Sequence, residues 1–129
     1  MISLLEKNRW LAVLLTILII IEIFYFSTLP GSTGTGGSIS LARIYHFVAF
    51  FLLAFFLLMS IKQNKKIKIS CVVITLIISI LCAITDEIHQ IFVPLRNASM
   101  GDILIDSFGI LFAVIIGLII NRKKTIPQI

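Results

Sequence analysis

Four long apolar runs, separated by shorter polar segments, follow one another along the chain at residues 10–29, 44–61, 69–93 and 103–120. Each run is close to the roughly 20 residues that an α-helix needs to cross the hydrocarbon core of a bilayer. None of the runs alternates apolar and polar residues, which is the pattern of strands in membrane β-barrels. The pattern therefore predicts an all-α fold, an integral membrane four-helix bundle, as a single transmembrane domain over residues 1–129.

The composition agrees with this class of protein. Of the 129 residues, 59% are hydrophobic and only 13% are charged, which is not the balance of a soluble domain. Lys7 and Arg9 before the first run resemble the start of a secretory signal peptide. That run is long, contains Glu22 and ends without a cleavage site of small residues, so we expect a retained first span.

Lysine and arginine are unevenly distributed along the chain. Nine of the 11 lie before the first span, between the second and third, or after the fourth: Lys7, Arg9, Lys62, Lys65, Lys66, Lys68, Arg122, Lys123 and Lys124. Because short cytoplasmic loops retain such residues, the N and C termini are both expected to be cytoplasmic, with the protein in the plasma membrane. Orientation and attraction to anionic lipid head groups account for the basic residues, so no nucleic acid is expected as a partner.

Ionisable and amide side chains fall at one depth of the bilayer when the four spans are threaded in alternating directions. The outer ends of the spans and their loops then hold Glu22, Arg43, His46, Asp86, Glu87, His89, Gln90, Arg96, Asp102 and Asp106. Ionisable residues within a membrane are costly and normally face a bundle interior or a water-filled cavity, where they serve function. We therefore expect these residues to form a polar binding pocket that opens to the cell exterior.

Helical spacing assigns faces to the polar residues of the third span. Asp86, His89 and Gln90 are three and four positions apart and share one face, whereas Glu87 is turned away by about 100°. Arg96 follows on a loop that must fold back toward the bundle. We expect Arg96 to pair with a carboxylate of the third or fourth span.

The fourth span combines acidic residues with a packing surface. Asp102 and Asp106 share a face, and Arg43 and His46 could serve the same acidic cluster from the second span. Below the acids, the same stripe continues with small residues that let another helix approach closely, namely Gly109, Ala113 and Gly117. The phenylalanines of the second span are expected to face lipid: Phe47, Phe50, Phe51, Phe55 and Phe56.

The expected pocket has an excess of negative charge, because its five carboxylates meet only two arginines. Neutrality would need protons, a divalent metal or a basic ligand. Zn, Mn or Mg could be bound by nitrogen and oxygen ligands chosen from His46, Asp86, Glu87, His89, Asp102 and Asp106. No other cofactor is predicted. A buried ion-pair network that only fixes the register of the helices is an alternative that needs no ligand.

Three segments resemble the VanZ-like family of small bacterial membrane proteins. "RIYHFVAFFLLA" (residues 43–54) is similar to that family's basic residue followed by His-Phe, and "YFSTLP" (residues 25–30) to the end of its first span. "TDEIHQIFVPLRNASMGDILIDSFG" (residues 85–109) is similar to its series of Asp-Glu, Gln, Arg and Asp. The chain departs from the family pattern at Arg43, where lysine is common, at Leu95, where glycine is usual, and at Asp106, where asparagine is frequent.

The resemblance implies a role in the Gram-positive cell envelope and in resistance to glycopeptide antibiotics of the lipid-tailed teicoplanin type. The expected partners are membrane lipids and a lipid-linked envelope precursor or a lipoglycopeptide, bound without catalysis. The alternative is a metal-assisted membrane enzyme that acts on a lipid-linked substrate. Coupled transport is a weaker alternative, since the inner halves of the spans lack ionisable residues that a pathway would need. The oligomeric state is left open.

Overall fold

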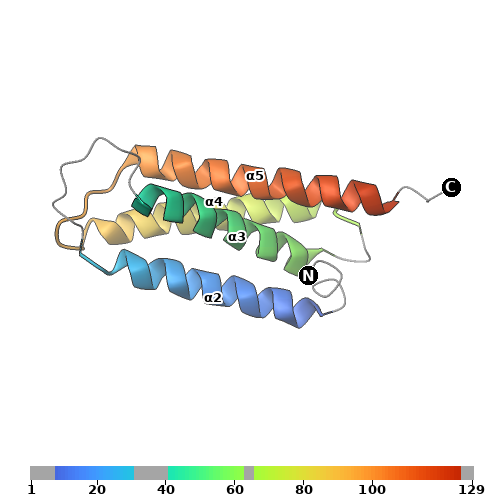
Figure 1. Ribbon diagram of the computed structural model, residues 1–129, viewed down its shortest axis with the longest axis horizontal. Helices are drawn as coiled ribbons and strands as arrows, with labels where there is room; N and C mark the ends of the chain where they lie inside the picture. The colour runs from blue at the N-terminus through green and yellow to red at the C-terminus, as the bar shows by residue number, and fades with distance from the viewer. Residues whose placement is uncertain (1–7, 31–40, 63–65, 126–129) are drawn as a thin grey trace.

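The computed structural model describes residues 8–30, 41–62 and 66–125. This part of the chain forms four helices, α2 (Arg9–Ser27), α3 (Leu41–Ile61), α4 (Ile69–Gln90) and α5 (Met100–Thr125). Successive helices run in alternating directions along the length of the bundle (Figure 1). All four are long and apolar enough to cross a membrane. The prediction of an all-α membrane fold with four spanning helices is therefore confirmed, and it indicates a multi-pass membrane protein.

The helix limits differ from the apolar runs by a few residues. α4 ends at Gln90 rather than at Val93, because the N–H groups of Phe92 and Val93 bond to carbonyls three residues back, which forms tight turns. Pro94 follows, and a proline disfavours helical geometry in the residue before it. At the other side of this loop, α5 begins earlier than predicted, where Ser99 Oγ accepts a hydrogen bond of 3.1 Å from the N–H of Gly101, the geometry of a helix N-cap.

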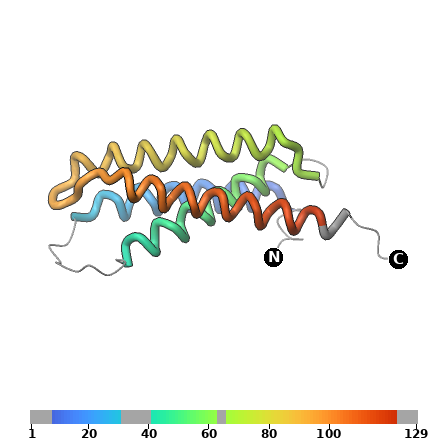
Figure 2. Tube along the Cα trace, turned by 90° about the horizontal axis from the view of Figure 1, so that it is seen from above, coloured from blue at the N-terminus to red at the C-terminus, as the bar shows by residue number. Residues whose placement is uncertain are grey.

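The central element of the bundle is α3. α3 and α4 each contact all three other helices, whereas α2 and α5 do not contact each other within the described ranges. α3 is the most deeply buried of the four, and Figure 2 shows it running obliquely to the others. Phe50 is fully buried, and Phe55 and Phe56 are less than a tenth exposed. The expectation that the phenylalanines of this span face lipid is therefore wrong for these three, because neighbouring helices take the place of lipid around α3.

The small-residue stripe of α5 lies against α3. A Cβ atom added to Gly109 would lie 2.5 Å from the carbonyl oxygen of Phe47, and one added to Gly117 would lie 2.7 Å from Cδ2 of Leu58. Ala113, between the two glycines, is fully buried. The absence of larger side chains at these positions is what allows the two helix backbones to approach so closely.

At the end of the bundle where α2 begins and α3 ends, Arg9 Nε donates a hydrogen bond of 2.9 Å to the carbonyl oxygen of Ser60. This is the end that carries the basic residues and is predicted to be cytoplasmic. Lys7, Lys65 and residues 31–40 lie outside the described residues. The opposite end, where α2 and α4 end and α3 and α5 begin (Figure 1), would then face outward.

The predicted orientation gives a direct test. A cysteine introduced as Asn97→Cys, at an exposed loop position, is expected to react with a membrane-impermeant maleimide in intact cells. The exposed Lys66→Cys position, at the other end, is expected to react only after permeabilisation. The unsubstituted protein, with its own Cys71 and Cys82, provides the background. If only Lys66→Cys is labelled in intact cells, the orientation is the opposite of the predicted one.

Candidate functional site

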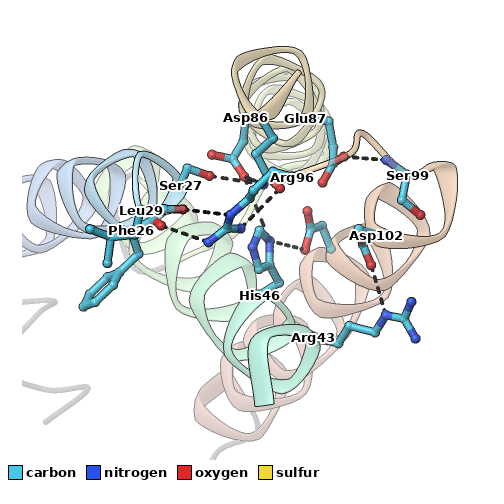
Figure 3. Close-up of polar contacts among 12 residues, drawn as sticks. Phe26, Ser27, Leu29, Arg43, His46, Asp86, Glu87, Arg96, Ser99 and Asp102 are labelled. Atoms are coloured by element: carbon cyan, nitrogen blue, oxygen red, sulfur yellow. Dashed lines mark hydrogen bonds and ion pairs between the residues drawn. The ribbon is translucent and has the colours of Figure 1, made fainter. Parts of the chain in front are cut away.

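Most of the polar side chains singled out in the sequence lie together at the end of the bundle opposite Arg9 (Figure 3). Five of them are less than a tenth exposed: His46, Asp86, Glu87, Gln90 and Asp106. We call these five residues, together with Arg96, the polar cluster. Burial of ionisable groups costs free energy unless they are paired and hydrogen-bonded, so their contacts determine what the cluster can do.

His46 lies between two carboxylates that come from different helices. Its Nδ1 atom is 3.4 Å from Oδ1 of Asp106 on α5 and 4.0 Å from Oδ2 of Asp86 on α4. Both aspartates are fully buried. An N–H group at Nδ1 would be directed toward both carboxylates and would weaken the repulsion between two negative charges that water cannot screen, so His46 connects α3 with α4 and α5.

Gln90, the last residue of α4, joins several parts of the cluster. Its Nε2 atom donates hydrogen bonds to Oγ of Ser27 (3.1 Å) and to Oδ2 of Asp86 (2.9 Å). Its Oε1 atom accepts a hydrogen bond of 3.3 Å from Nη1 of Arg96. Both polar atoms of the amide are thus used, and α2, α4 and the loop before α5 are linked through one side chain.

Arg96 folds back over the end of α2, as expected, but its partners differ from the expected ones. Its Nε atom donates to the carbonyl oxygen of Leu29 (3.1 Å) and its Nη2 atom to that of Phe26 (3.1 Å), in addition to the bond to Gln90 (Figure 3). No carboxylate in the described part of the chain pairs with it. The prediction of a carboxylate partner was wrong because carbonyl groups at and just beyond the end of α2 accept the guanidinium instead. A helix end leaves carbonyl groups without their i+4 donors, and among the described residues the carbonyl of Phe26 has only one backbone donor, the N–H of Leu29, in a turn bond of 3.2 Å.

Two further contacts surround the start of α5. Arg43 Nε lies 3.2 Å from Oδ1 of Asp102, in an ion pair that is half exposed on the arginine side. Glu87 Oε2 accepts a hydrogen bond of 2.8 Å from the backbone N–H of Ser99. The first contact joins α3 to α5 and the second joins α4 to the N-terminus of α5, where a negative charge is favourable.

Besides Arg43 and Asp102, two more of the predicted residues lie outside the polar cluster, His89 and Glu22. His89 packs the edge of its ring against Phe24 of α2, with ring centroids 6.1 Å apart, and its Nε2 atom has no hydrogen-bond partner among the described residues. Asp86, His89 and Gln90 together span about 100° of the helix circumference. His89 lies at one edge of this face and therefore reaches α2 instead of the cluster. Glu22 is partly buried on α2 and has no hydrogen bond or ion pair to another described residue.

A cavity of about 550 Å³ lies beside the polar cluster, between the end of α2, the start of α3 and the loop before α5. His46, Gln90, Arg96, Asn97 and Asp102 supply its polar wall, and apolar side chains supply the rest, including Phe26, Leu41, Tyr45 and Leu95. Sequence reasoning missed Ser27, which is buried and bound to Gln90. Its place at the same depth as the acids was the available signal.

Leu95, in the cavity wall, has a positive φ of 62°. This left-handed conformation costs a residue with a Cβ atom roughly 1–2 kcal/mol, and glycine adopts it freely. It is the position at which the family pattern usually has glycine. The strain is located directly before Arg96, where the chain turns to place the guanidinium over α2.

The metal-ligand set proposed from the sequence does not come together. Within residues 8–30, 41–62 and 66–125, no three His, Cys, Asp or Glu side chains are arranged so that they could hold a metal ion. His89 points to α2 and Asp102 pairs with Arg43, which separates them from Asp86 and Asp106. The geometry therefore gives no support to a metal centre.

Four membrane-spanning helices with a buried polar cluster and a cavity at one end define a small multi-pass membrane protein. The chain belongs to the VanZ/LLP1 family, whose pattern matches residues 7–121. This match covers nearly the whole chain and confirms the VanZ-like resemblance. No curated protein and no solved structure matches the chain.

Proposed function

We propose that this protein binds the anionic head group of a lipid-anchored envelope component in the cavity beside Arg96, and that it thereby reduces susceptibility to teicoplanin-type glycopeptides. The observation that carries the proposal is the position of Arg96 in the cavity wall, held by three hydrogen bonds to the protein. A lipid-tailed glycopeptide of the teicoplanin type is the second ligand that the cavity beside Arg96 would accept. The antibiotic part of the proposal comes from family membership.

Arg96 has donor groups to spare. A guanidinium carries five N–H donors, and three of its nitrogens each make one recorded bond, to Leu29, Phe26 and Gln90. About two N–H groups remain, and a guanidinium binds phosphate or carboxylate oxygens with paired, charge-assisted hydrogen bonds. Because the protein already fixes the arginine side chain, little further ordering is needed when an anion binds.

The cavity also has the dimensions and the lining for an amphipathic ligand. Its volume of about 550 Å³ lies within the range of about 300–1,000 Å³ that is typical of small-molecule sites. Phe26, Leu41 and Leu95 line it and are exposed on the surface of the bundle. An acyl chain leaving the cavity would therefore meet apolar side chains, while the head group meets Arg96.

The test uses a susceptible Gram-positive host that expresses the protein. The protein is expected to raise the teicoplanin concentration that inhibits growth, with no change for vancomycin. Arg96→Ala is expected to abolish this effect, and lipid that copurifies with the protein should bind about 10–100-fold more weakly, from the roughly 1.5–3 kcal/mol of a hydrogen bond to a charged group. Lipid content is measured by mass spectrometry.

Arg9→Ala is the matched control, because Arg9 also bonds to a carbonyl oxygen but lies at the opposite end of the bundle. It should leave both readouts unchanged. Expression and thermal stability of each variant are measured alongside. If Arg96→Ala is folded, retains lipid and protects as well as the unsubstituted protein, the proposed function is rejected.

A further inference from the structure

His46 presents one edge of its imidazole ring to buried carboxylates and the other to the cavity. Nδ1 lies near Asp106 and Asp86, and the residue lines the cavity wall. Nε2, across the ring, has no hydrogen-bond partner in the described parts of the chain and is not enclosed by protein atoms, as Nδ1 is. A water molecule or a ligand in the cavity can therefore reach Nε2.

The plane of the imidazole ring is fixed by its neighbours. Phe50 stacks on it with ring centroids 6.2 Å apart and an angle of 24° between the planes. Tyr45 packs edge-on against it with centroids 5.9 Å apart. The ring is thus held by packing and by carboxylates, which is how a reactive side chain is kept in a productive orientation.

We propose that this cavity is the active site of a lipid phosphohydrolase, in which His46 is the general base and Arg96 holds the phosphoryl group. The proposal rests on the proposed function, because Arg96 must first bind the phosphate of a lipid head group. The substrate class is a lipid phosphodiester or a lipid diphosphate. Phosphoryl transfer depends mainly on positioning and on positive charge against the phosphoryl oxygens, and the guanidinium supplies both.

Water is the second reactant. As its oxygen forms a bond to phosphorus, Nε2 of His46 accepts a proton from it, and the bond between phosphorus and the leaving oxygen breaks with its electron pair. The leaving oxygen takes up a proton from water in the cavity, and the imidazolium then releases its proton to water. The products are a phosphate and an alcohol, or two phosphates, and no atom is oxidised or reduced.

The carboxylates behind His46 have a defined part in this step. Asp106 and Asp86 orient the imidazole through Nδ1 and stabilise the imidazolium between the two proton transfers. Their distances of 3.4 and 4.0 Å are long for hydrogen bonds, and such bonds commonly shorten when a substrate fills the site. The titratable and charged groups around His46 are Tyr45 from α3, Asp86 and Glu87 from α4, Asp106 from α5 and Arg96 from the loop.

The experiment uses purified protein in maltoside micelles, which contain no phosphorus, with a chelator and water enriched in ¹⁸O. Phosphatidylglycerol and a polyprenyl diphosphate are the two probes. Unsubstituted protein is expected to form a phosphate product that carries one ¹⁸O atom, and the probe that yields it distinguishes a diester from a diphosphate substrate. His46→Gln should slow this reaction at least about 100-fold, the usual lower limit for a general base.

His89→Gln is the matched control, since the structure places His89 against Phe24 and outside the cavity wall. It should keep the reaction rate, and both variants should retain as much probe as the unsubstituted protein. If the unsubstituted protein retains a probe but labels neither phosphate, hydrolysis is rejected and the proposed function stands. If it retains no probe, both proposals fail. Equal rates for His46→Gln and the unsubstituted protein reject the role of His46.

Discussion

Gly109→Ala is expected to lower the free energy of unfolding by about 3 kcal/mol or more, at the upper end of the cost of overpacking. The added Cβ atom would lie 2.5 Å from the carbonyl oxygen of Phe47 and 3.3 Å from the backbone nitrogen of Phe51. Both are backbone atoms of α3 and cannot rotate away. α5 would have to move outward along its contact with the central helix.

The measurement is thermal or denaturant unfolding of purified protein in detergent, with Gly117→Ala as the control. At Gly117 the nearest atom is Cδ2 of Leu58, 2.7 Å away, at the end of a flexible side chain that can change rotamer. Gly117→Ala should cost less than about 1.5 kcal/mol. Where no clash occurs, replacing glycine by alanine inside a helix raises the free energy of unfolding by about 0.5–1 kcal/mol. An increase in stability for Gly109→Ala would therefore contradict the observed packing.

The sequence was informative wherever a residue's depth in the membrane decided its position. Alternating threading of four apolar runs brings the polar residues to one end, and the partners of Arg43 and His46 follow from it, since both meet acidic residues of the neighbouring helices. The depth of a residue in the membrane does not show whether lipid or another helix lies beside it. Lipid and helix surfaces are equally apolar, so the burial of Phe50 on the central helix has no signal in the pattern.

Contacts to the backbone were the other limit. Arg96 is held by the carbonyl oxygens of Phe26 and Leu29, and every residue has a carbonyl group, so no residue type identifies these acceptors. The hydrogen bond from the backbone N–H of Ser99 to Glu87 could not be predicted either, because nearly every residue has a backbone N–H group. Charge counting therefore assigned Arg96 to a carboxylate, although the carbonyl groups at a helix end satisfy a guanidinium equally well.

Gln90→Leu is expected to reduce both stability and ligand binding, because one amide serves three partners. Leucine is of similar size but would leave Ser27, Asp86 and Arg96 each without a hydrogen bond that they now have. A buried group left unsatisfied costs about 1–3 kcal/mol, and more for a charged one. We expect a loss of about 2–5 kcal/mol, measured by unfolding in detergent.

Ser79→Ala is the control for this change, since Ser79 is also fully buried on α4 but its Oγ atom has no hydrogen-bond partner in the described residues. It should leave stability nearly unchanged. Gln90→Glu separates the two functions of the amide, because it keeps an acceptor for Arg96 but places a second carboxylate where Gln90 now donates to Asp86 at 2.9 Å. Retained lipid binding in Gln90→Glu, together with its loss in folded Gln90→Leu, would assign the orientation of Arg96 to Gln90. Full lipid binding in Gln90→Leu would instead show that the carbonyl groups at the end of α2 suffice to hold the guanidinium.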